Sequence, residues 1–599
     1  MIAASALLTG AVDAADVDVT SSITTDTTWT SDNVYHLSGF ITVDGASLTI
    51  EPGTVIKGAA GTGTDATALI VSRTGTINAV GFASAPIIFT AEADPMDGSW
   101  GPEEGNAWGG VIILGNAPVN SNQTKTGTAP VEDTIEGIPS FLPESSRVFG
   151  GSNPEDSSGA LSYVSIRFGG SELAGDSEIN GLTLGGVGRG TQIDHIEVFG
   201  NSDDSIEFFG GTVDVKYAVA AYGGDDGFDY DQGWEGRGQF WVYVGAVVAN
   251  SKFEPDNGGE HDGELADQGG NIGGGTIYNA TYIGNGDKGF ALRIRDNAYA
   301  VYKNSIFTGW PAGIRIEADS GTRIGTTESS IDITNNIWDF DSAVLFHGDE
   351  TDTLGAGGTD IDDDEAFLAE AQYKNTVEAA LLTGISRTAD SGLDPRPLAG
   401  SPALSNELAT LPVGDTFFDE VDYQGAFSKD DNWMQGWTYL SQAGYLAQSE
   451  ASSSEIVNVS ARANLSAGEN LIPGFTVIGT KTLLIRAVGS KLADLGVPNA
   501  MVDPIMTLFK TNFDGSPADE IATIDDWTEG NVAKISAAAR HTGLFPFTPI
   551  DDFQGTALPT DDVKSAAALV TLGTGVYTVV VSSADGGSGD VLVDVTEVE

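Results

Sequence analysis

A short segment that recurs along the middle of the chain constrains the fold more than any other feature. The segment occurs four times, at residues 196–206 (IEVFGNSDDSI), 219–228 (VAAYGGDDGF), 280–290 (ATYIGNGDKGF) and 305–314 (SIFTGWPAGI). The apolar residues that close the first two copies, Ile206 and Phe228, lie 22 positions apart, and Phe290 and Ile314 lie 24 apart. A period of this length, with short apolar runs broken by Gly, Asn and Asp, is typical of a solenoid whose coils stack on one another.

The first part of the chain consists of short apolar segments without helical patterns between them. They are four to six residues long and bounded by Gly or Pro, which is a β signature. Continuous apolar runs such as Val111–Leu114 suit strands that are covered on both faces, as parallel strands are. The sequence therefore predicts an all-β chain with a parallel β-helix over residues 17–447. Within it we expect a polar loop insertion at 252–275 and a helical insertion at 362–382.

The two ends of the chain differ from the β-helix in composition and in residue pattern. Residues 1–15 contain an apolar stretch followed by small residues, which indicates a signal peptide that lacks its basic leader. Residues 448–455 (QSEASSSE) form a Ser-rich linker, and residues 456–599 contain short strands at intervals that predict a small β-sandwich. We therefore expect a protein that is secreted or held at the outer cell surface.

Charge and composition exclude several classes of function. The chain carries 86 acidic and 27 basic residues, a net charge of −59, which opposes binding to nucleic acid. Such a surface suits divalent cations, neutral polymers or a salty medium. Cysteine is absent, so disulfides and thiolate metal sites are excluded. No apolar run has the length of a membrane span, and no nucleotide-binding or serine-hydrolase elbow motif is present.

Several separate blocks resemble a large group of exported bacterial right-handed parallel β-helix proteins. The blocks are LTIEPGTVIKG (48–58), WGGVIILGNAPVN (108–120), IEFFGGTVDVKY (206–217), DDGFDYDQGWEGRGQF (225–240) and VDYQGAFSKDDNWMQGWTYL (421–440). The resemblance covers about residues 20–445 and implies a surface or extracellular location without a defined reaction. Residues 456–599, which include LLIRAVGSKLADLGV and GVYTVVVSSADGGSGDVLVDVTEVE, resemble a β-sandwich module associated with display or adhesion.

The paired aspartates in the repeat are the strongest candidates for chemistry. Coils of a parallel solenoid lie about 4.8 Å apart, so Asp203 and Asp204 should lie beside Asp225 and Asp226. Together with Asp229, these residues are candidate calcium ligands, because calcium prefers oxygen ligands of flexible geometry. The same residues could instead serve only the turns, through Asx turns and left-handed positions, or take part in catalysis.

The catalytic alternative rests on an order of residues similar to that in polygalacturonase-like hydrolases. Asp203, the pair Asp225 and Asp226, His261 and Arg293 follow one another in that order. The resemblance implies that Asp226 is the acid, that Asp203 and Asp225 hold the water and that Arg293 binds the substrate. The sequence departs from the pattern because His261 is flanked by Glu and Asp rather than by glycines, and because an arginine stands at position 295 in place of the lysine.

Aromatic residues crowd the same region of the repeat. Four of them, Tyr222, Tyr230, Trp234 and Trp241, are candidates for an exposed surface that stacks on sugar rings. The alternative is that these rings fill the interior of the solenoid.

These observations together predict a structural or adhesive protein at the cell surface. It is expected to bind extracellular polysaccharide or another surface component, with calcium as the candidate ion. The alternative function is cleavage of a polysaccharide by the aspartates on adjacent coils. The sequence does not indicate an oligomeric state.

Overall fold

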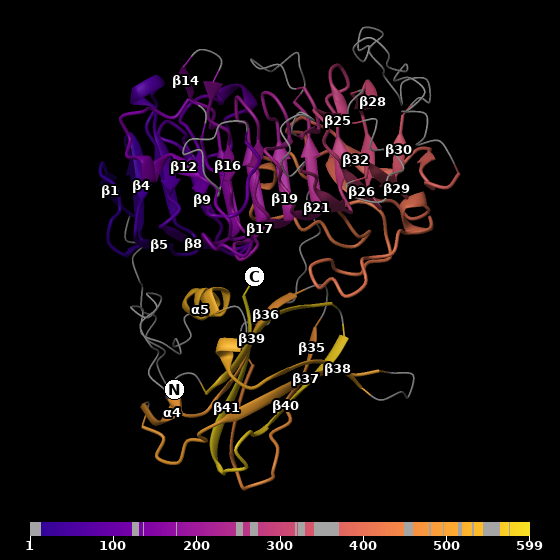
Figure 1. Ribbon diagram of the computed structural model, residues 1–599. Helices are drawn as coiled ribbons and strands as arrows, with labels where there is room; N and C mark the ends of the chain where they lie inside the picture. The colour runs from indigo at the N-terminus through magenta and orange to yellow at the C-terminus, as the bar shows by residue number, and fades with distance from the viewer. Residues whose placement is uncertain are drawn as a thin grey trace. The chain divides into compact units, whose positions relative to one another are not determined.

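The structure of the protein is a computed structural model, and it is an all-β fold with two compact units (Figure 1). It describes residues 14–121, 131–135, 137–174, 177–246, 256–263, 273–317, 320, 330–340, 371–447, 459–477, 481–494, 496–512, 518–529, 532–542, 564–573 and 575–598. The first unit comprises residues 1–81 and 85–447, and the second comprises 82–84 and 448–599. Apart from residues 14 and 15, the predicted signal peptide lies outside the described residues, as does the predicted linker.

The first unit is a parallel β-helix built from two long sheets. The nine-stranded sheet contains β4 (Phe40–Val43), β7 (Ala68–Val71), β10 (Val111–Leu114), β16 (Leu182–Gly185), β18 (Ile206–Phe209), β20 (Phe228–Asp231), β22 (Gly259–Asp262), β25 (Phe290–Arg295) and β28 (Ala312–Ile316). The eighteen-stranded sheet contains β1 (Ala15–Val19), β2 (Thr27–Trp29), β3 (Asn33–Leu37), β5 (Ser47–Ile50), β6 (Val55–Gly58), β8 (Thr76–Val80), β9 (Ile87–Ala91), β13 (Gly159–Arg167), β17 (Gln192–Phe199), β19 (Asp214–Ala221), β21 (Arg237–Val244), β23 (Thr276–Tyr278), β24 (Thr281–Ile283), β26 (Val301–Lys303), β27 (Ile306–Thr308), β29 (Asp332–Thr334), β30 (Ile337–Asp339) and β31 (Thr376–Val377). All strand pairs within these two sheets are parallel, as predicted.

The register between coils confirms the repeat and refines it. Ile206 in β18 pairs with Phe228 in β20, so the 22-residue period is one turn of the solenoid. Further along, Phe290 pairs with Ala312 rather than with Ile314, which pairs with Leu292 instead. Because side chains alternate between the two faces of a strand, each coil directs every second residue into the core.

The corner of the eighteen-stranded sheet is formed by residues with left-handed backbone conformation. Tyr163, His195, Tyr217 and Phe240 have φ angles between 50° and 59° in the strands β13, β17, β19 and β21. Their rings stack from coil to coil, with centroids 4.1, 4.4 and 4.8 Å apart. In later coils asparagines such as Asn304 adopt the same conformation, which asparagine tolerates better than most residues. In the coils where an aromatic residue stands at this corner, the ring contacts help to offset the free-energy cost of the left-handed backbone.

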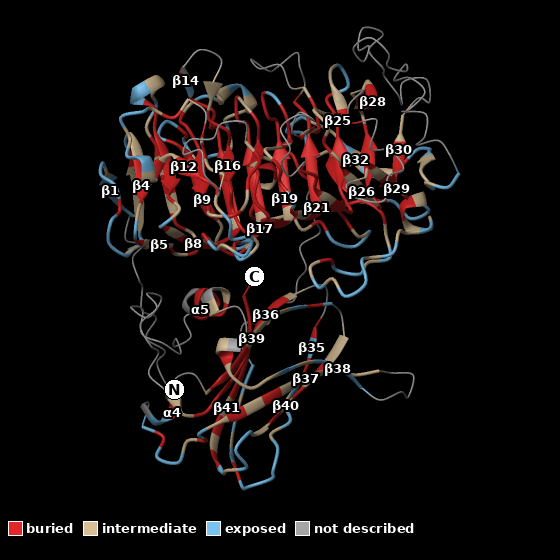
Figure 2. Ribbon diagram, viewed as in Figure 1, coloured by how far each residue is buried: buried red, intermediate tan, exposed pale blue. Residues whose placement is uncertain are grey.

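Large apolar side chains fill the interior of the β-helix, and Figure 2 shows the strands of this unit as mostly buried, in red. Phe208 and Phe228 lie on the inward face of the nine-stranded sheet, and Trp241 lies on the opposite wall. The ring of Phe228 stacks on that of Trp241 with centroids 4.4 Å apart. Burial of these rings is the main favourable term for a fold in which a single coil has no core of its own.

Two predicted insertions are corrected by the structure. Gly259–Asp262, within the segment expected to be a loop, forms β22 between β20 and β25. The strand forms because His261 points into the core while its neighbours face outward. Of the predicted helical insertion, residues 362–370 lie outside the described residues, and 371–382 contain the strand β31 instead of a helix. Thr376 and Val377 pair with β30 and so extend the solenoid by another coil.

The closing segment of the first unit packs against the eighteen-stranded sheet. The short helix α3 (Tyr439–Gln442) begins at Thr438, whose side chain accepts a hydrogen bond from the Ser441 amide. The buried Glu197 carboxylate accepts the backbone N–H groups of Tyr439 and Leu440 at 2.5 and 3.2 Å. A hairpin, β32 (Leu382–Ile385) and β33 (Leu393–Pro397), precedes this segment. Shorter pairs are β11 (Asp133–Thr134) with β12 (Val148–Phe149), and β14 (Glu172–Ala174) with β15 (Ser177–Glu178).

The second unit consists of two four-stranded antiparallel sheets, which fits the predicted small β-sandwich. One sheet contains β34 (Val459–Leu465), β41 (Gly589–Glu597), β36 (Lys481–Val488) and β39 (Ala566–Leu572). The other contains β35 (Gly474–Val477), β40 (Gly575–Ser583), β37 (Pro504–Lys510) and β38 (Asp519–Ile524). Side chains from both sheets, such as Ile485 and Val579, share one core. The helices are α4 (Lys491–Asp494) and α5 (Val532–His541), and no described helix is long and apolar enough to cross a membrane.

Candidate functional site

The outward face of the nine-stranded sheet carries a row of acidic residues that continues into arginines. The row consists of residues in register on successive strands, namely Thr183, Glu207, Asp229, Glu260, Arg293 and Arg315. Ile206 and Phe208, which flank Glu207, point into the core. The alternation that fills the core therefore also aligns the charged side chains on the outside.

Five carboxylates form one group at the acidic end of this row, which we call the acid cluster. Glu207 and Asp229 come from the row, and Asp203, Asp204 and Asp225 come from the turns that precede β18 and β20. Oxygen atoms of Asp203, Asp204 and Asp225 all lie within 4.8 Å of one another, and so do those of Asp204, Glu207 and Asp229. Asp204 belongs to both sets and joins them. The predicted proximity of the aspartates on neighbouring coils is thus observed.

A small cavity opens beside the acid cluster. Its volume is about 170 Å³, and it is lined by Asp203, Asp204 and Glu207 together with polar residues of the preceding coil. The latter include Glu178 and Asn180. The side-chain amide of Asn180 donates a hydrogen bond to the Glu207 carboxylate. Carboxylates of the acid cluster therefore face one common polar cavity.

Burial and mutual repulsion raise the pKa of these carboxyls. Desolvation is the main cause for Asp204, followed by the charges of Asp203 and Asp225, and its pKa lies well above the usual range. Desolvation, then the charge of Asp204, likewise raises the pKa of Glu207 and Asp229. Among the described residues, no lysine or arginine forms an ion pair with any of these three carboxyls. The cluster must therefore take up protons or a cation to relieve its repulsion.

The donor set fits a calcium ion. All groups within the acid cluster are carboxylates, and calcium binds oxygen ligands in flexible geometry. The Oδ1 atom of Asp229 is buried and, among the described residues, has no hydrogen-bond partner. Buried carboxylate oxygens are normally satisfied, so this atom is free to act as a ligand.

Asp226 has a different environment from the other predicted metal ligands. Its carboxylate is buried and accepts the backbone N–H of Asn257 on the next coil at 2.5 Å. Its own N–H donates to the Asp204 carboxylate at 2.8 Å, and the Asn257 side chain accepts the N–H of Phe290 at 3.1 Å. Asp204, Asp226 and Asn257 thus connect the backbones of successive coils, so for Asp226 the structure shows the turn chemistry that the sequence left open.

The basic end of the row is an ion-pair network. Glu260 accepts hydrogen bonds from Arg293 at 2.7 Å and from Arg295 at 3.0 Å. Arg293 also contacts Glu317 at 2.9 Å, so its guanidinium is held between two carboxylates. Burial, followed by the charge of Glu260, raises the pKa of Asp262 to about 8. Arg293, predicted to bind substrate, lies on the outer face but is already paired.

His261 cannot act on a polysaccharide because it lies inside the solenoid. Its side chain is buried, and its ring stacks on Tyr230 with centroids 4.0 Å apart. The Nδ1 atom faces the Glu260 carbonyl, which can only accept, so Nε2 accepts the hydrogen bond from the Tyr302 hydroxyl at 2.9 Å. Burial lowers the pKa of His261 to about 3. The alternative that placed this histidine at a catalytic centre is therefore wrong.

The predicted aromatic binding surface is also corrected. Tyr230, Trp234 and Trp241 are fully buried. The indole N–H groups of Trp234 and Trp241 donate to the carbonyls of Val213 and Val215 at 3.2 and 3.0 Å. These rings fill the core and leave no face for a ligand. Tyr222 is buried as well, although it lines a separate cavity described below.

Three charged residues of the outer face, Glu207, Glu260 and Asp262, escaped prediction. Glu207 stands after Ile206 as the predicted ligand Asp229 stands after Phe228, so the repeat itself could have added Glu207 to the set. Glu260 and Asp262 were hidden because the polar sequence around β22 suggested a loop. The signal available in the sequence was the alternation around His261.

Comparison with known proteins identifies the family of the first unit. One similar solved structure is the pre-peptidase C-terminal domain of a collagenase from Bacillus anthracis, which is 13% identical; the match covers 23% of this chain and 90% of that chain, with a TM-score of 0.14. Another is the enzymatically active domain of tailspike protein 2 of bacteriophage CBA120, which is 11% identical; the match covers 93% of this chain and 71% of that chain, with a TM-score of 0.18. Their TM-scores are too low to bear on fold or function. A search of curated proteins found no match.

Residues 21–380 match the profile of the family described as "Pectate-lyase like beta helix domain". This match spans more than half of the chain and coincides with the parallel coils seen in the structure. The chain therefore belongs to the pectate-lyase-like β-helix family.

Proposed function

We propose that the protein binds an extracellular polysaccharide on the outer face of the nine-stranded sheet, with a calcium ion held by the acid cluster. The observation that carries this proposal is the group of five carboxylates that meet beside a cavity, three of them without a basic partner among the described residues. Membership of the family points to a polysaccharide-related role and leaves open whether the protein binds or cleaves.

The geometry of the face suits a polymeric ligand. Successive coils present polar and charged groups at a spacing of about 4.8 Å, so one chain of sugars could contact several coils. The acidic end alone would repel an anionic sugar. A bound calcium ion would reduce that repulsion and could itself coordinate sugar hydroxyl or carboxylate oxygens.

The cellular setting belongs to the same proposal. The small-residue start of the sequence and the similarity of residues 456–599 to display modules support a secreted or surface-held protein with an adhesive role. In that setting, calcium is available from the medium.

Retention on immobilised polysaccharides tests the proposal. The wild-type protein and the double variant Asp204→Asn/Asp229→Asn would be compared on a neutral polysaccharide and a polyuronate, with calcium and with a chelator. We expect calcium-dependent retention that the double variant loses and that the control Asp65→Asn keeps, because Asp65 is exposed and outside the cluster. Equal retention of wild type and double variant, or retention unaffected by chelation, would contradict the role of the cluster.

Cleavage remains a second candidate because two carboxyls in this region, one in the turn before β20 and one in β22, have raised pKa values. The pKa of Asp225 is raised to about 6, and the pKa of Asp262 is raised to about 8. Asp262 lies beside Glu260, which is paired with two arginines. A carboxyl that keeps its proton near neutral pH can serve as a general acid. Release of reducing ends, lost in Asp225→Asn or Asp262→Asn, would favour cleavage; retention without product would favour binding.

A further inference from the structure

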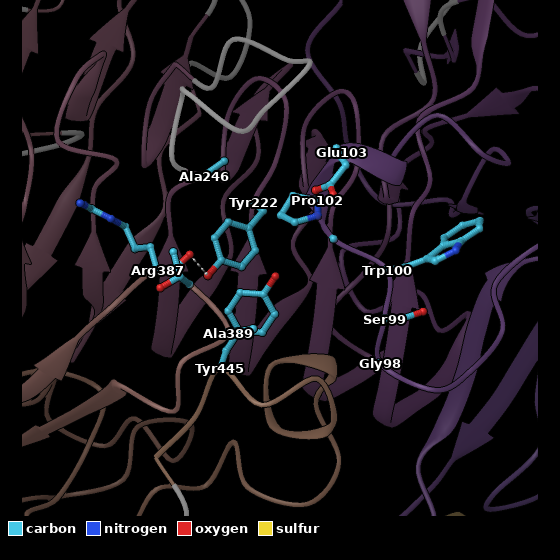
Figure 3. Close-up of a pocket in the computed structure, with 12 residues that line it drawn as sticks. Gly98, Ser99, Trp100, Pro102, Glu103, Tyr222, Ala246, Arg387, Ala389 and Tyr445 are labelled. Atoms are coloured by element: carbon cyan, nitrogen blue, oxygen red, sulfur yellow. Dashed lines mark hydrogen bonds between the residues drawn. The ribbon is translucent and has the colours of Figure 1, made fainter.

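A second cavity lies in the first unit among residues that the acid cluster does not include (Figure 3). Its volume is about 430 Å³, within the range of small-molecule sites, about 300–1,000 Å³. Three parts of the β-helix unit form its walls: the turn 98–103, the segment 387–389 between β32 and β33, and the tyrosines Tyr222 and Tyr445. We call it the Tyr445 pocket.

Two tyrosine rings form one wall of the Tyr445 pocket. The rings of Tyr222 and Tyr445 lie with centroids 5.3 Å apart, and Tyr445 also contacts the ring of Phe199. The Tyr222 hydroxyl donates to the Arg387 carbonyl at 3.1 Å and is therefore satisfied. Packing on both sides fixes these rings, so the wall exists before any ligand arrives.

The Tyr445 hydroxyl is the unusual group in this pocket. Tyr445 is only 6% exposed, yet its hydroxyl has no hydrogen-bond partner among the described residues. Figure 3 shows this hydroxyl directed from the ring towards Pro102. Burial and the charge of Glu103 raise its pKa to about 12, so it keeps its proton and can donate. The hydroxyl is open to the pocket, where a ligand oxygen can accept its hydrogen bond in place of water.

The charges around the pocket define the kind of ligand it can hold. The Arg387 guanidinium points away from the tyrosines in Figure 3, and its Nη1 donates to the Gly284 carbonyl. The Glu103 carboxylate remains as the charged group on the rim, which Ser99 and Thr388 also line. This set opposes an anion and offers both donors and acceptors to hydroxyl groups.

We infer that the Tyr445 pocket binds one end or one short stretch of a neutral saccharide. Sugar rings present apolar C–H faces, which can pack on Pro102 at the pocket wall, and hydroxyls, which exchange hydrogen bonds with Tyr445 and Glu103. The site goes beyond the proposed function because it uses neither the acid cluster nor calcium. It would give the protein a second, cation-independent contact with carbohydrate.

Saturation-transfer NMR with the full-length protein tests this inference. The probes are cellobiose, maltose, xylobiose and mannobiose as neutral disaccharides, and digalacturonate as an acidic one, all in the presence of a chelator. We expect at least one neutral disaccharide to bind and digalacturonate not to bind. Tyr445→Phe, which keeps the ring packing, should weaken binding by about three- to tenfold, the effect of one hydrogen bond.

A second variant keeps the test independent of the hydroxyl. Ala389 is exposed on the rim, so Ala389→Trp should fill the pocket and abolish binding, whereas the matched control Ala389→Ser should preserve it. The variant Asp204→Asn/Asp229→Asn should bind these disaccharides as wild type does, which separates this site from the acid cluster. Failure of all four neutral probes to bind, tighter binding of digalacturonate, or binding unchanged in both Tyr445→Phe and Ala389→Trp would overturn the inference.

Discussion

Asp229 illustrates how one position on a coil can be unfavourable without an ion and useful with one. Its carboxylate lies against those of Asp204 and Glu207, and its Oδ1 atom is buried without a hydrogen bond among the described residues. The inward neighbours Phe228 and Tyr230 are fixed in the core, so the side chain cannot turn away from the cluster. The position is thus imposed by the strand.

Asp229→Asn should change stability in opposite directions with and without calcium. In a chelator, loss of one charge relieves repulsion, so the melting temperature should rise above that of wild type. In calcium, loss of a ligand should weaken calcium binding on the order of tenfold or more and shrink the calcium-dependent gain in melting temperature. Differential scanning calorimetry measures both effects. A variant that behaves like Asp65→Asn in both conditions would show that Asp229 is not a ligand.

Glu197 illustrates a buried charge that is fully partnered. Besides the amides of Tyr439 and Leu440, it accepts the Ser165 hydroxyl at 2.6 Å, and that same hydroxyl accepts the Arg167 Nε–H at 2.8 Å. The carboxylate and the guanidinium, both buried, therefore stabilise the closing segment on the eighteen-stranded sheet.

Glu197→Gln should destabilise the β-helix because it removes the larger of the two carboxylate charges, those of Glu197 and Asp94, that compensate the buried Arg167 guanidinium. The expected cost is about 3 kcal/mol in the free energy of unfolding, measured by urea denaturation followed by tryptophan fluorescence. Glu155→Gln is the matched control: Glu155 is 66% exposed where it meets Arg189, so its loss should cost less than about 1 kcal/mol. Equal costs for the two variants would contradict the role assigned to Glu197.

At the scale of elements, the corner of the eighteen-stranded sheet depends on residues that accept a left-handed conformation. Asn304 has φ 56° and is 3% exposed. Its side chain accepts the Ala409 N–H at 2.7 Å and donates to the Ala409 carbonyl at 3.3 Å. The residue therefore both turns the strand and attaches a distant segment of the chain.

Asn304→Ala should lower the free energy of unfolding by about 2–3 kcal/mol, from the left-handed backbone and the lost hydrogen bonds. Asn304→Gly loses the same hydrogen bonds but adopts this φ without a steric penalty. The glycine variant should therefore lose about half as much in urea denaturation. If the glycine variant were the less stable of the two, the backbone argument would fail.

The elements that could be predicted from the sequence are those with a strong repeat. Ile206 and Phe228 marked the coil period because burial requires apolar residues there, and the same period brought the aspartates together. The strand around His261 was missed because a polar, glycine-rich segment lacks the apolar run that marks a strand and offers only the alternation around His261 as a signal. Trp234 and Trp241 were ambiguous for another reason: composition does not show which face of a strand points inward.

At the scale of the whole molecule, the raised pKa values predict how stability depends on pH. Native carboxyls with raised pKa values bind more protons than the unfolded chain does, so stability falls as pH rises through the native values. In a chelator, we expect the melting temperature to fall between about pH 5 and pH 8, the range set by Asp225 near 6 and Asp262 near 8. Calcium should remove the part of the fall that comes from the acid cluster.

The same measurements of melting temperature against pH include two controls. Asp262→Asn should flatten the fall near pH 8 with or without calcium, because Asp262 lies outside the acid cluster. Below about pH 6.5 buried His261 opposes this trend, since with a pKa of about 3 it stays neutral while the unfolded histidine gains a proton, so the fall should be steepest between about pH 6.5 and pH 8. A melting temperature in chelator that rises steadily from pH 5 to pH 8 would contradict the repulsion within the cluster.

The location of a calcium ion tests the central claim most directly. Anomalous diffraction from crystals grown with calcium should show a peak about 2.3–2.6 Å from carboxylate oxygens of Asp204 and Asp229, and the peak should vanish in Asp204→Asn/Asp229→Asn. Crystals that contain calcium elsewhere but show no peak among these carboxylates would contradict the account.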